Sequence, residues 1–224
     1  MGQKVSVFSI WRDSAKDIHQ TLKQLEDLES LQRFDFSYYF YENDSKDNTV
    51  EILNEWLSSR SGELKFESLN AEKFGNTPDP KRMKFLVSCR NKCKGLAKDN
   101  DSHYSLIFDS DVKFNKENFE LQLQTLNTLE SRGMYFSDCP SYQRDDQFDW
   151  KISKPIITTS SFGGFALLRS EVFNKVKWSA DFHCDHVNMC FDISRFGNIY
   201  CDPKSKVYVN IGLNRMDLNK CSQS

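Results

Sequence analysis

The chain has 224 residues and a formal net charge of −2, with 30 Lys and Arg against 32 Asp and Glu. A chain of this length buries roughly 70% of the surface that its unfolded form exposes, which is enough for one domain with a sizeable core and no crosslinks. Because the basic residues are scattered and balanced by acids, the charge pattern excludes a general affinity for nucleic acid. An anionic ligand must therefore be held by a local site.

The seven cysteines are odd in number and form no CxxC pair. This spacing favours reduced thiols over a disulfide framework and argues against zinc. No apolar run approaches the ~20 residues that a membrane-spanning helix needs, so we expect no transmembrane segment. A strand-like pattern begins almost at Met1 and leaves no room for a signal peptide, so we expect a cytoplasmic protein.

Strand-like and helical patterns alternate through the first half of the chain. Residues 5–10 predict a β-strand, and the apolar spacing from 13 to 29 predicts a helix. An aromatic strand over 34–41 follows, and then a polar turn leads to a helix over 50–57, for which Asp47 is the predicted N-cap. Each strand is thus followed by a helix.

The alternation continues with a short strand over 64–68, a helix over 81–98 and a strand over 104–108. Strands that alternate with helices predict an α/β fold with a mostly parallel, doubly wound sheet flanked by helices.

The pattern changes after residue 111. We predict a helix over 116–129, strands over 134–137 and 165–169, and shorter elements that together build a mixed C-terminal portion. No internal repeat is present, so we expect a single domain over residues 1–210 and a polar tail over 211–224. The C-terminal portion is expected to form the side that receives a second substrate.

The most informative stretch is the apolar run 106–108 followed by Asp109, Ser110 and Asp111. Ligands of open α/β sheets bind at the carboxyl ends of strands, so two carboxylates there indicate oxygen ligands for a divalent cation and, through it, a phosphate-bearing substrate. The alternative is structural, because Asp-x-Asp also occurs as a turn or a helix N-cap after a strand.

Two further motifs accompany this one. The acidic turn 42–49 closes the second strand, and Arg90-Asn91 lies on the helix before the acidic strand. In the later part of the chain the segments 160–166 and 184–192 continue the pattern. In this order the motifs resemble nucleotide-sugar glycosyltransferases of the GT-A fold, and specifically the fungal capsule-associated α-1,3-mannosyltransferase family and similar sugar transferases of large DNA viruses.

The resemblance implies that Asp109 and Asp111 bind Mn²⁺ or Mg²⁺, which bridges the diphosphate of a UDP- or GDP-sugar. Asp111 is the expected direct ligand, whereas Asp109, with Ser110, is also expected among the donor-binding residues. The usual third metal ligand of these enzymes is a histidine near the C-terminus, and Val207 to Asn210 offers none. Aspartate, backbone or water oxygens are expected to complete the shell.

The same resemblance assigns the ends of the first two strands to the nucleotide pocket. Ser9, Trp11 and Arg12 are expected to form one wall, and Glu42 with Asn43 to meet the base or the ribose. Each of these assignments has a structural alternative: Trp11 could pack in the core instead of stacking, and the acidic turn could simply cap the next helix.

Arg82 and Arg90 lie eight residues apart, about two helical turns, so they project from neighbouring parts of one helix face. In the family pattern the arginine before Asn91 faces the nucleotide, and a guanidinium suits phosphate because it forms bidentate hydrogen bonds. Surface salt bridges are the alternative, above all for Arg82.

Gly163 and Gly164 predict a close approach of the backbone to the sugar or the acceptor, with a ligand-free β-bulge as the alternative. Asp185 stands where GT-A enzymes place an acid beside the acceptor hydroxyl. The neighbouring residue is His186 instead of the common second acid, so the catalytic base is Asp185, His186, or neither if the reaction retains configuration. We expect Asp185→Ala to spare donor binding.

Together these motifs predict a metal-dependent glycosyltransferase that moves a sugar from a nucleotide-diphosphate sugar, UDP in preference to GDP, to a carbohydrate or glycoprotein hydroxyl. A sugar-nucleotide nucleotidyltransferase is one alternative, although such enzymes carry a Gly-rich loop after the first strand and Ile10 to Ser14 contains no glycine. A non-catalytic nucleotide- or glycan-binding module is another.

Overall fold

The computed structural model describes residues 2–74, 79–128, 135–136, 156–158, 164–180, 185–202, 205 and 208–209. Its helices are α1 (Ile18–Glu29), α2 (Thr49–Leu57), α3 (Pro80–Lys94), α4 (Lys116–Thr128), α5 (Ser170–Phe173) and α6 (Asp185–Ser194). Its strands are β1 (Gln3–Trp11), β2 (Phe34–Asn43), β3 (Gly62–Glu67), β4 (Tyr104–Phe108), β5 (Val112–Lys113), β6 (Tyr135–Phe136), β7 (Ile156–Thr158), β8 (Phe165–Arg169), β9 (Ile199–Cys201) and β10 (Tyr208–Val209).

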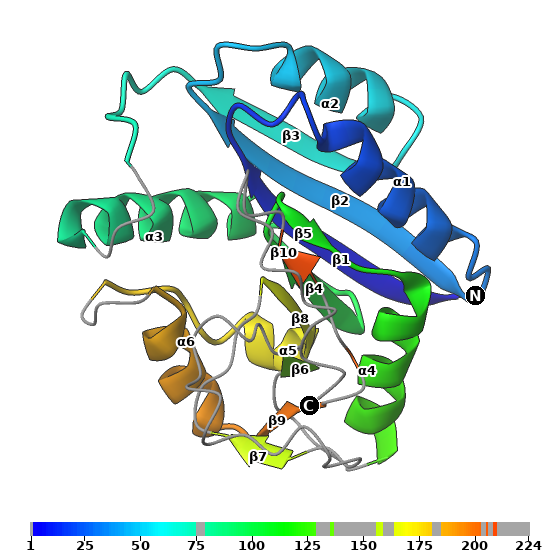
Figure 1. Ribbon diagram of the computed structural model, residues 1–224. Helices are drawn as coiled ribbons and strands as arrows, with labels where there is room; N and C mark the ends of the chain where they lie inside the picture. Colours follow the sequence, from blue (N-terminus) through cyan, green and yellow to red (C-terminus); the bar gives the residue numbers. More distant parts are fainter. Residues whose placement is uncertain are drawn as a thin grey trace, which may run out of the picture.

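Eight of these strands form one sheet in the order β3-β2-β1-β4-β8-β6-β9-β7 (Figure 1). The first four run parallel, as the alternation of strands and helices predicts, because each is joined to the next by a helical crossover. β4 is buried along its whole length, which is typical of a central strand covered on both faces. The sequence prediction of a mostly parallel α/β sheet flanked by helices is confirmed.

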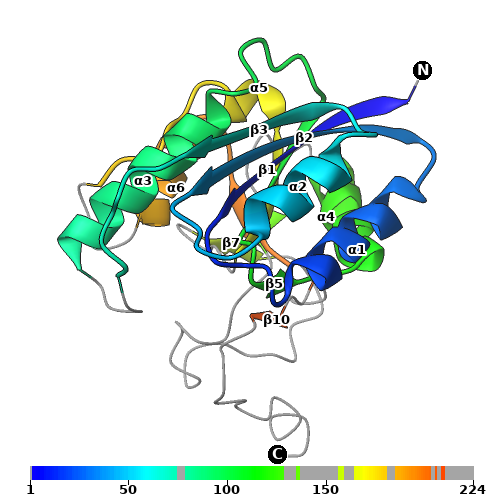
Figure 2. The same cartoon turned by 90° about the horizontal axis from the view of Figure 1, so that it is seen from above.

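The sheet separates two hydrophobic cores, and the alternation along β1 shows why. Val5, Val7 and Trp11 point to the side covered by α1, α2 and α4, whereas Phe8 points to the side covered by α3, α5 and α6. Figure 2 shows the two groups of helices on opposite faces of the strands. The carboxyl ends of the parallel strands lie between these two layers of helices.

The C-terminal portion is mixed, as predicted. β8 pairs antiparallel with β4 and β6, and β6 pairs parallel with β9. A separate two-stranded sheet joins β10 antiparallel to β5, the strand that follows Asp111 directly. The second half of the fold therefore extends the sheet on the side of β4 that faces away from β1.

Two predicted helix boundaries are wrong. The helix expected from residue 13 begins at Ile18, because residues 13–15 donate their backbone N–H groups to side chains of the next β–α turn instead of to a helix. The helix expected to reach Lys98 ends at Lys94, because beyond Gly95 the helical hydrogen bonds give way to a tighter turn in which the Leu96 N–H donates to the carbonyl of Cys93.

Four cysteines lie in the described part of the chain, and all four are buried: Cys89, Cys93, Cys190 and Cys201. No helix among the described residues is both long and apolar enough to cross a membrane. The domain limits at 1–210 stay a prediction, and the tail at 211–224 lies outside the described residues.

Candidate functional site

A cleft of about 550 Å³ opens at the carboxyl ends of β1, β2 and β4. This is the edge at which open α/β sheets bind their ligands. The turn after β1, the loop before α3 and one face of α3 form its walls. Its lining residues are Ile10, Trp11, Arg12, Asp13, Ser14, Lys16, Asp17, Asn43, Lys73, Phe74, Arg82, Phe85, Leu86, Arg90, Asp109, Ser110 and Asp111.

The Asp-x-Asp segment forms a tight turn on the floor of this cleft. The backbone N–H of Val112 donates to the carbonyl of Asp109 over 3.0 Å, and Thr21 Oγ1 donates to the carbonyl of Ser110 over 3.1 Å. The Asp109 N–H donates to the carbonyl of Gly164 over 2.8 Å. The segment is thus a turn, as the structural alternative holds, and it also presents both carboxylates to the cleft.

The two carboxylates differ in environment. Asp109 Oδ1 lies 2.9 Å from Arg90 Nη1, whereas Asp111 is the more exposed of the two residues and forms no ion pair with any described residue. Partial desolvation, together with the negative charge of Asp109, raises the pKa of Asp111 to about 6. A divalent cation bound beside Asp111 would relieve this repulsion.

The donor set fits a hard cation that shares its shell with a substrate. No group of three or more His, Cys, Asp or Glu side chains converges within the described residues, so these residues alone build no complete metal cage there. Mg²⁺ in phosphate-binding sites is usually held by one or two carboxylates, with phosphate and water oxygens filling the remaining positions. Asp109 and Asp111 match that arrangement.

The loop after β1 is held by the loop after β2. Asp13 N–H donates to Ser45 Oγ, Ser14 N–H to Thr49 Oγ1, and Ala15 N–H to Asp47 Oδ2. Asp47 Oδ1 also accepts from the N–H of Thr49, the first residue of α2, but the N-cap of this helix is Asn48, one residue after the predicted Asp47. These contacts replace the helical turn expected at residue 13 and leave the cleft open.

Asp44 holds the loop before α3, which forms the opposite wall of the cleft. The sequence patterns did not single this residue out. Its backbone has a positive φ of 57°, and its carboxylate accepts from the N–H groups of Leu69, Asn70 and Ala71 over 2.7–3.2 Å. Although burial acts to raise the pKa of Asp44, the Asn43 amide and these N–H groups lower it. An Asp in a polar turn was the only sequence signal.

Arg12 ties the same loop to the end of β1. Its guanidinium donates through Nη1 to the carbonyl of Glu72 over 3.2 Å and through Nη2 to that of Ala71 over 3.0 Å. Lys73 Nζ lies 2.7 Å from Asp13 Oδ2 and closes the wall from the other side. Arg12 lines the cleft as predicted, but its observed contacts are with the loop.

Of the remaining residues predicted on the first two strands, only some line the cleft. Asn43 lines the cleft. Glu42 is buried on the α1 and α2 side and accepts from the Ser45 N–H over 2.8 Å, which is the contact of a structural turn. Ser9 is buried outside the cleft lining, and Trp11 lines the cleft while its ring packs edge-on against Phe40 and Phe108.

Both arginines predicted on α3 face the cleft. Arg82 forms no ion pair or hydrogen bond with any residue that the structure describes. Arg90 is 7% exposed, and besides Asp109 it contacts Asp185 of α6, with 2.7 Å between Arg90 Nε and Asp185 Oδ2. Burial alone would lower the pKa of Arg90, but the charges of Asp109 and Asp185 raise it above its ordinary value.

Asp185 and His186 begin α6 and are both buried. Burial acts to raise the pKa of Asp185, but His186 and Arg90 lower it to about 2. His186 Nδ1 accepts from Trp178 Nε1 over 3.4 Å, and burial lowers the pKa of His186 to about 4 despite Asp185. The imidazole is therefore neutral near pH 7, with its proton on Nε2 toward Asp185 Oδ2, 3.6 Å away.

Gly164 lies where the sequence predicts a close backbone approach, and the approach is to the acidic turn. Its φ is +80°, and a Cβ at this position would come within 2.4 Å of Val112 Cγ2 and 3.3 Å of Asp109 Oδ2. Only glycine meets both conditions without strain. Gly163 lies outside the described residues.

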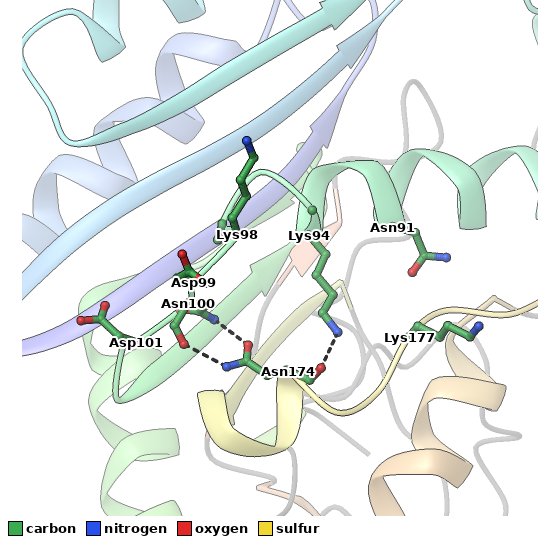
Figure 3. A pocket seen from close by; sticks show the side chains of 10 residues that line it. Asn91, Lys94, Lys98, Asp99, Asn100, Asp101, Asn174 and Lys177 are labelled. Carbon is green, nitrogen blue, oxygen red and sulfur yellow. Dashed lines mark hydrogen bonds between the residues drawn. The ribbon is translucent and has the colours of Figure 1, made fainter.

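A second cleft, of about 810 Å³, lies at the other end of α3 (Figure 3). The Lys94 ammonium group is already hydrogen-bonded within the protein, since it donates to the backbone carbonyl of Phe173 over 2.7 Å. Lys98 and Lys177 point in different directions in Figure 3. This cleft is larger, but Asn100 and Asn174 are hydrogen-bonded to each other and Lys94 to backbone carbonyls, so we assign the candidate site to the cleft with the Asp-x-Asp turn.

Solved structures with the same fold include glycosyltransferases of the GT-A type. The chain matches S. aureus TarS (1–349) over 92% of its length at 16% identity with a TM-score of 0.62, and covers 59% of that chain. It matches the mannosyltransferase PcManGT from Pyrobaculum calidifontis, in complex with GDP-Man and Mn²⁺, over 98% at 14% identity with a TM-score of 0.67, and covers 60% of it.

TarS in complex with UDP-GlcNAc matches 92% of the chain at 17% identity with a TM-score of 0.60, and the chain covers 57% of it. The chain therefore spans about three fifths of the length of these neighbours. Neither a protein-family model nor a curated protein sequence matches it.

At these identities the likeness establishes the fold: the chain has the GT-A architecture of nucleotide-sugar glycosyltransferases. The fold class predicted from the sequence is confirmed. The finer resemblance to the capsule-associated mannosyltransferases and their viral counterparts stays a prediction.

Proposed function

We propose that this chain is a metal-dependent glycosyltransferase that transfers a sugar from a nucleotide-diphosphate sugar to a hydroxyl of a glycan or glycoprotein. The observation that carries the proposal is the position of Asp109 and Asp111 on the floor of a cleft whose α3 wall presents Arg82. A cation held by the two carboxylates would contact a diphosphate from one side, and the Arg82 guanidinium on the α3 wall would contact it from the other.

The neighbours support the same chemistry, because one was solved with GDP-Man and Mn²⁺ and another with UDP-GlcNAc. A cation bound by Asp109 and Asp111 would act as a Lewis acid on the leaving diphosphate. Arg82 would bind a phosphate oxygen directly, and Asn43, Trp11 and Arg12 would shape the nucleotide end of the cleft. UDP is the donor nucleotide that we predict in preference to GDP.

The contacts of His186 argue against its acting as the base. Its Nδ1 accepts from Trp178, and burial lowers its pKa to about 4, far from the operating pH at which general bases work best. Asp185 keeps its charge but is held by Arg90, 2.7 Å away. Of the two predicted catalytic residues, Asp185 is the one that we retain beside the acceptor.

The nucleotidyltransferase alternative is weaker, because the loop after β1 is held by side chains of the neighbouring loop and has no Gly-rich phosphate cradle. A non-catalytic binding module would share the cleft and the cation. Turnover separates it from a transferase, since only an enzyme releases free nucleoside diphosphate from the donor.

The test is a thermal-shift panel of UDP-, GDP-, CMP- and dTDP-sugars, each with Mn²⁺ and with EDTA. A ligand that binds only the folded state raises its melting temperature. We expect a Mn²⁺-dependent increase with one nucleoside diphosphate class, followed by nucleotide release when glycan acceptors are added. No shift with any donor would contradict the proposal.

A further inference from the structure

Arg90 lies between the two halves of the candidate site. Its Nη1 is 2.9 Å from Asp109 Oδ1, and its Nε is 2.7 Å from Asp185 Oδ2. The first carboxylate follows β4 on the donor side, and the second begins α6 on the predicted acceptor side. The guanidinium comes from α3, which packs against both β1 and α6.

This arrangement differs from the role that the sequence resemblance gives to Arg90. A guanidinium that contacts phosphate needs its donors directed into the cleft, whereas two N–H groups of Arg90 are directed at protein carboxylates. Buried charges are stable only when they are paired and hydrogen-bonded, and at 7% exposure Arg90 meets that condition through the two acids.

From this geometry we infer that Arg90 is a positioning residue that couples Asp185 to the cation-binding carboxylate Asp109. The inference rests on the proposed function and deepens it. Arg90 divides its charge between the two acids. When Asp185 is neutral, Asp109 is the remaining carboxylate of the bridge, so Arg90 holds it more tightly and competes more strongly with a divalent cation.

The inference reverses one expectation from the sequence, namely that loss of the Asp185 carboxylate spares donor binding. We expect Asp185→Asn to weaken binding of Mn²⁺ together with UDP or GDP by roughly 5–10-fold, the lower range of coupling between sites. Asp185→Glu keeps the carboxylate and is expected to recover most of the affinity.

The test is a double-mutant cycle on affinity, measured by calorimetry and by electron paramagnetic resonance of free Mn²⁺. Arg90→Lys keeps a buried positive charge, so it is expected to fold, but it lacks the planar fork that spans two carboxylates. If Arg90 relays the effect, Asp185→Asn changes the Mn²⁺ affinity much less in the Arg90→Lys background than in the unmodified protein. Additive effects, or an unchanged affinity in Asp185→Asn, would overturn the inference.

A matched control is available on the same helix. Lys92 pairs with Glu67, an ion pair outside the cleft lining, so Lys92→Gln is expected to leave the Mn²⁺ and nucleotide affinities unchanged. If the unmodified protein binds neither nucleotide with Mn²⁺, the proposed function is wrong and the inference fails with it. If the protein binds one of them and the cycle is additive, only the inference fails.

Discussion

Asp111 is the residue on which metal binding depends most directly. Asp111 is exposed, and its carboxylate takes no part in an ion pair with any described residue. Asp111→Asn is expected to weaken Mn²⁺-dependent nucleotide binding by roughly 100-fold, since even changes to groups that support metal ligands cost 10–100-fold. Calorimetric titration with UDP or GDP and Mn²⁺ measures this loss.

Asp111→Asn should not weaken the fold. Because the pKa of Asp111 is raised, the folded state disfavours its charge, so the neutral side chain is expected to keep or increase the melting temperature at pH 7.5. Asp99→Asn, an exposed acid in the cleft of Figure 3, is the matched control and should change neither property. A melting temperature that falls sharply in Asp111→Asn would assign Asp111 to the scaffold.

A second prediction concerns the backbone conformation at Gly164. Gly164→Ala places a Cβ 2.4 Å from Val112 Cγ2 on a backbone with φ +80°, so we expect a loss of roughly 2 kcal/mol or more in urea unfolding. Gly95→Ala is the control, because its φ is −65° and its nearest contacts are 3.4 Å away. Similar stabilities for the two variants would show that the acidic turn adapts without strain.

Among the elements, the loop before α3 depends on Asp44. Asp44→Ala removes the acceptor of three backbone N–H groups, those of Leu69, Asn70 and Ala71. We expect faster hydrogen exchange confined to residues 69–73 and weaker nucleotide binding, with a small change in overall stability. Asp101→Ala, which loses only an exposed ion pair with Lys4, should leave exchange in this loop unchanged.

The start of α6 gives the fold a pH dependence. The pKa of His186 is about 4 in the folded state against an ordinary value of 6.5, so the unfolded chain binds more protons between these pH values. The contribution of His186 to stability therefore falls as the pH decreases from 6.5 toward 4, by roughly 2 kcal/mol at pH 5. Because the raised pKa of Asp111 acts in the opposite direction, the His186 effect is read from two proteins: between pH 7.5 and 5, urea unfolding should show a larger loss of stability in the unmodified protein than in His186→Gln.

The sequence predicts the elements well where hydrophobic periodicity decides them. The strand at 165–169 and the parallel order of the first strands agree with the structure. The turn at residue 13 could not be predicted, because its helical spacing is overridden by side chains of residues 45–49, which are distant in sequence. Local patterns carry no information about such contacts.

Some residues of the candidate site can likewise be predicted from the sequence, and others cannot. Asp109, Asp111, Arg82 and Asn43 follow from their places at strand ends and on one helix face, and all line the cleft. The bridge from Arg90 to Asp185 joins α3 to α6 over 95 positions of sequence, and no spacing rule reveals it. Glu42 shows the converse, since a motif residue meets the Ser45 N–H instead of the cleft.

In the whole molecule, the two halves of the sheet have different roles in the proposed function. The parallel half, β3-β2-β1-β4, ends in the cleft that we assign to the donor, and the mixed half extends the sheet beyond β4 (Figure 1). α3 and α6 connect the halves through Arg90 and Asp185. We therefore expect one cation at the junction, beside Asp111.

Anomalous scattering at the manganese absorption edge, in crystals grown with Mn²⁺ and UDP or GDP, would locate this cation. We expect one strong anomalous peak within coordination distance of Asp111, between the turn after β4 and the α3 wall. A bound nucleotide without such a peak, or a peak confined to the cleft at the other end of α3, would contradict this expectation.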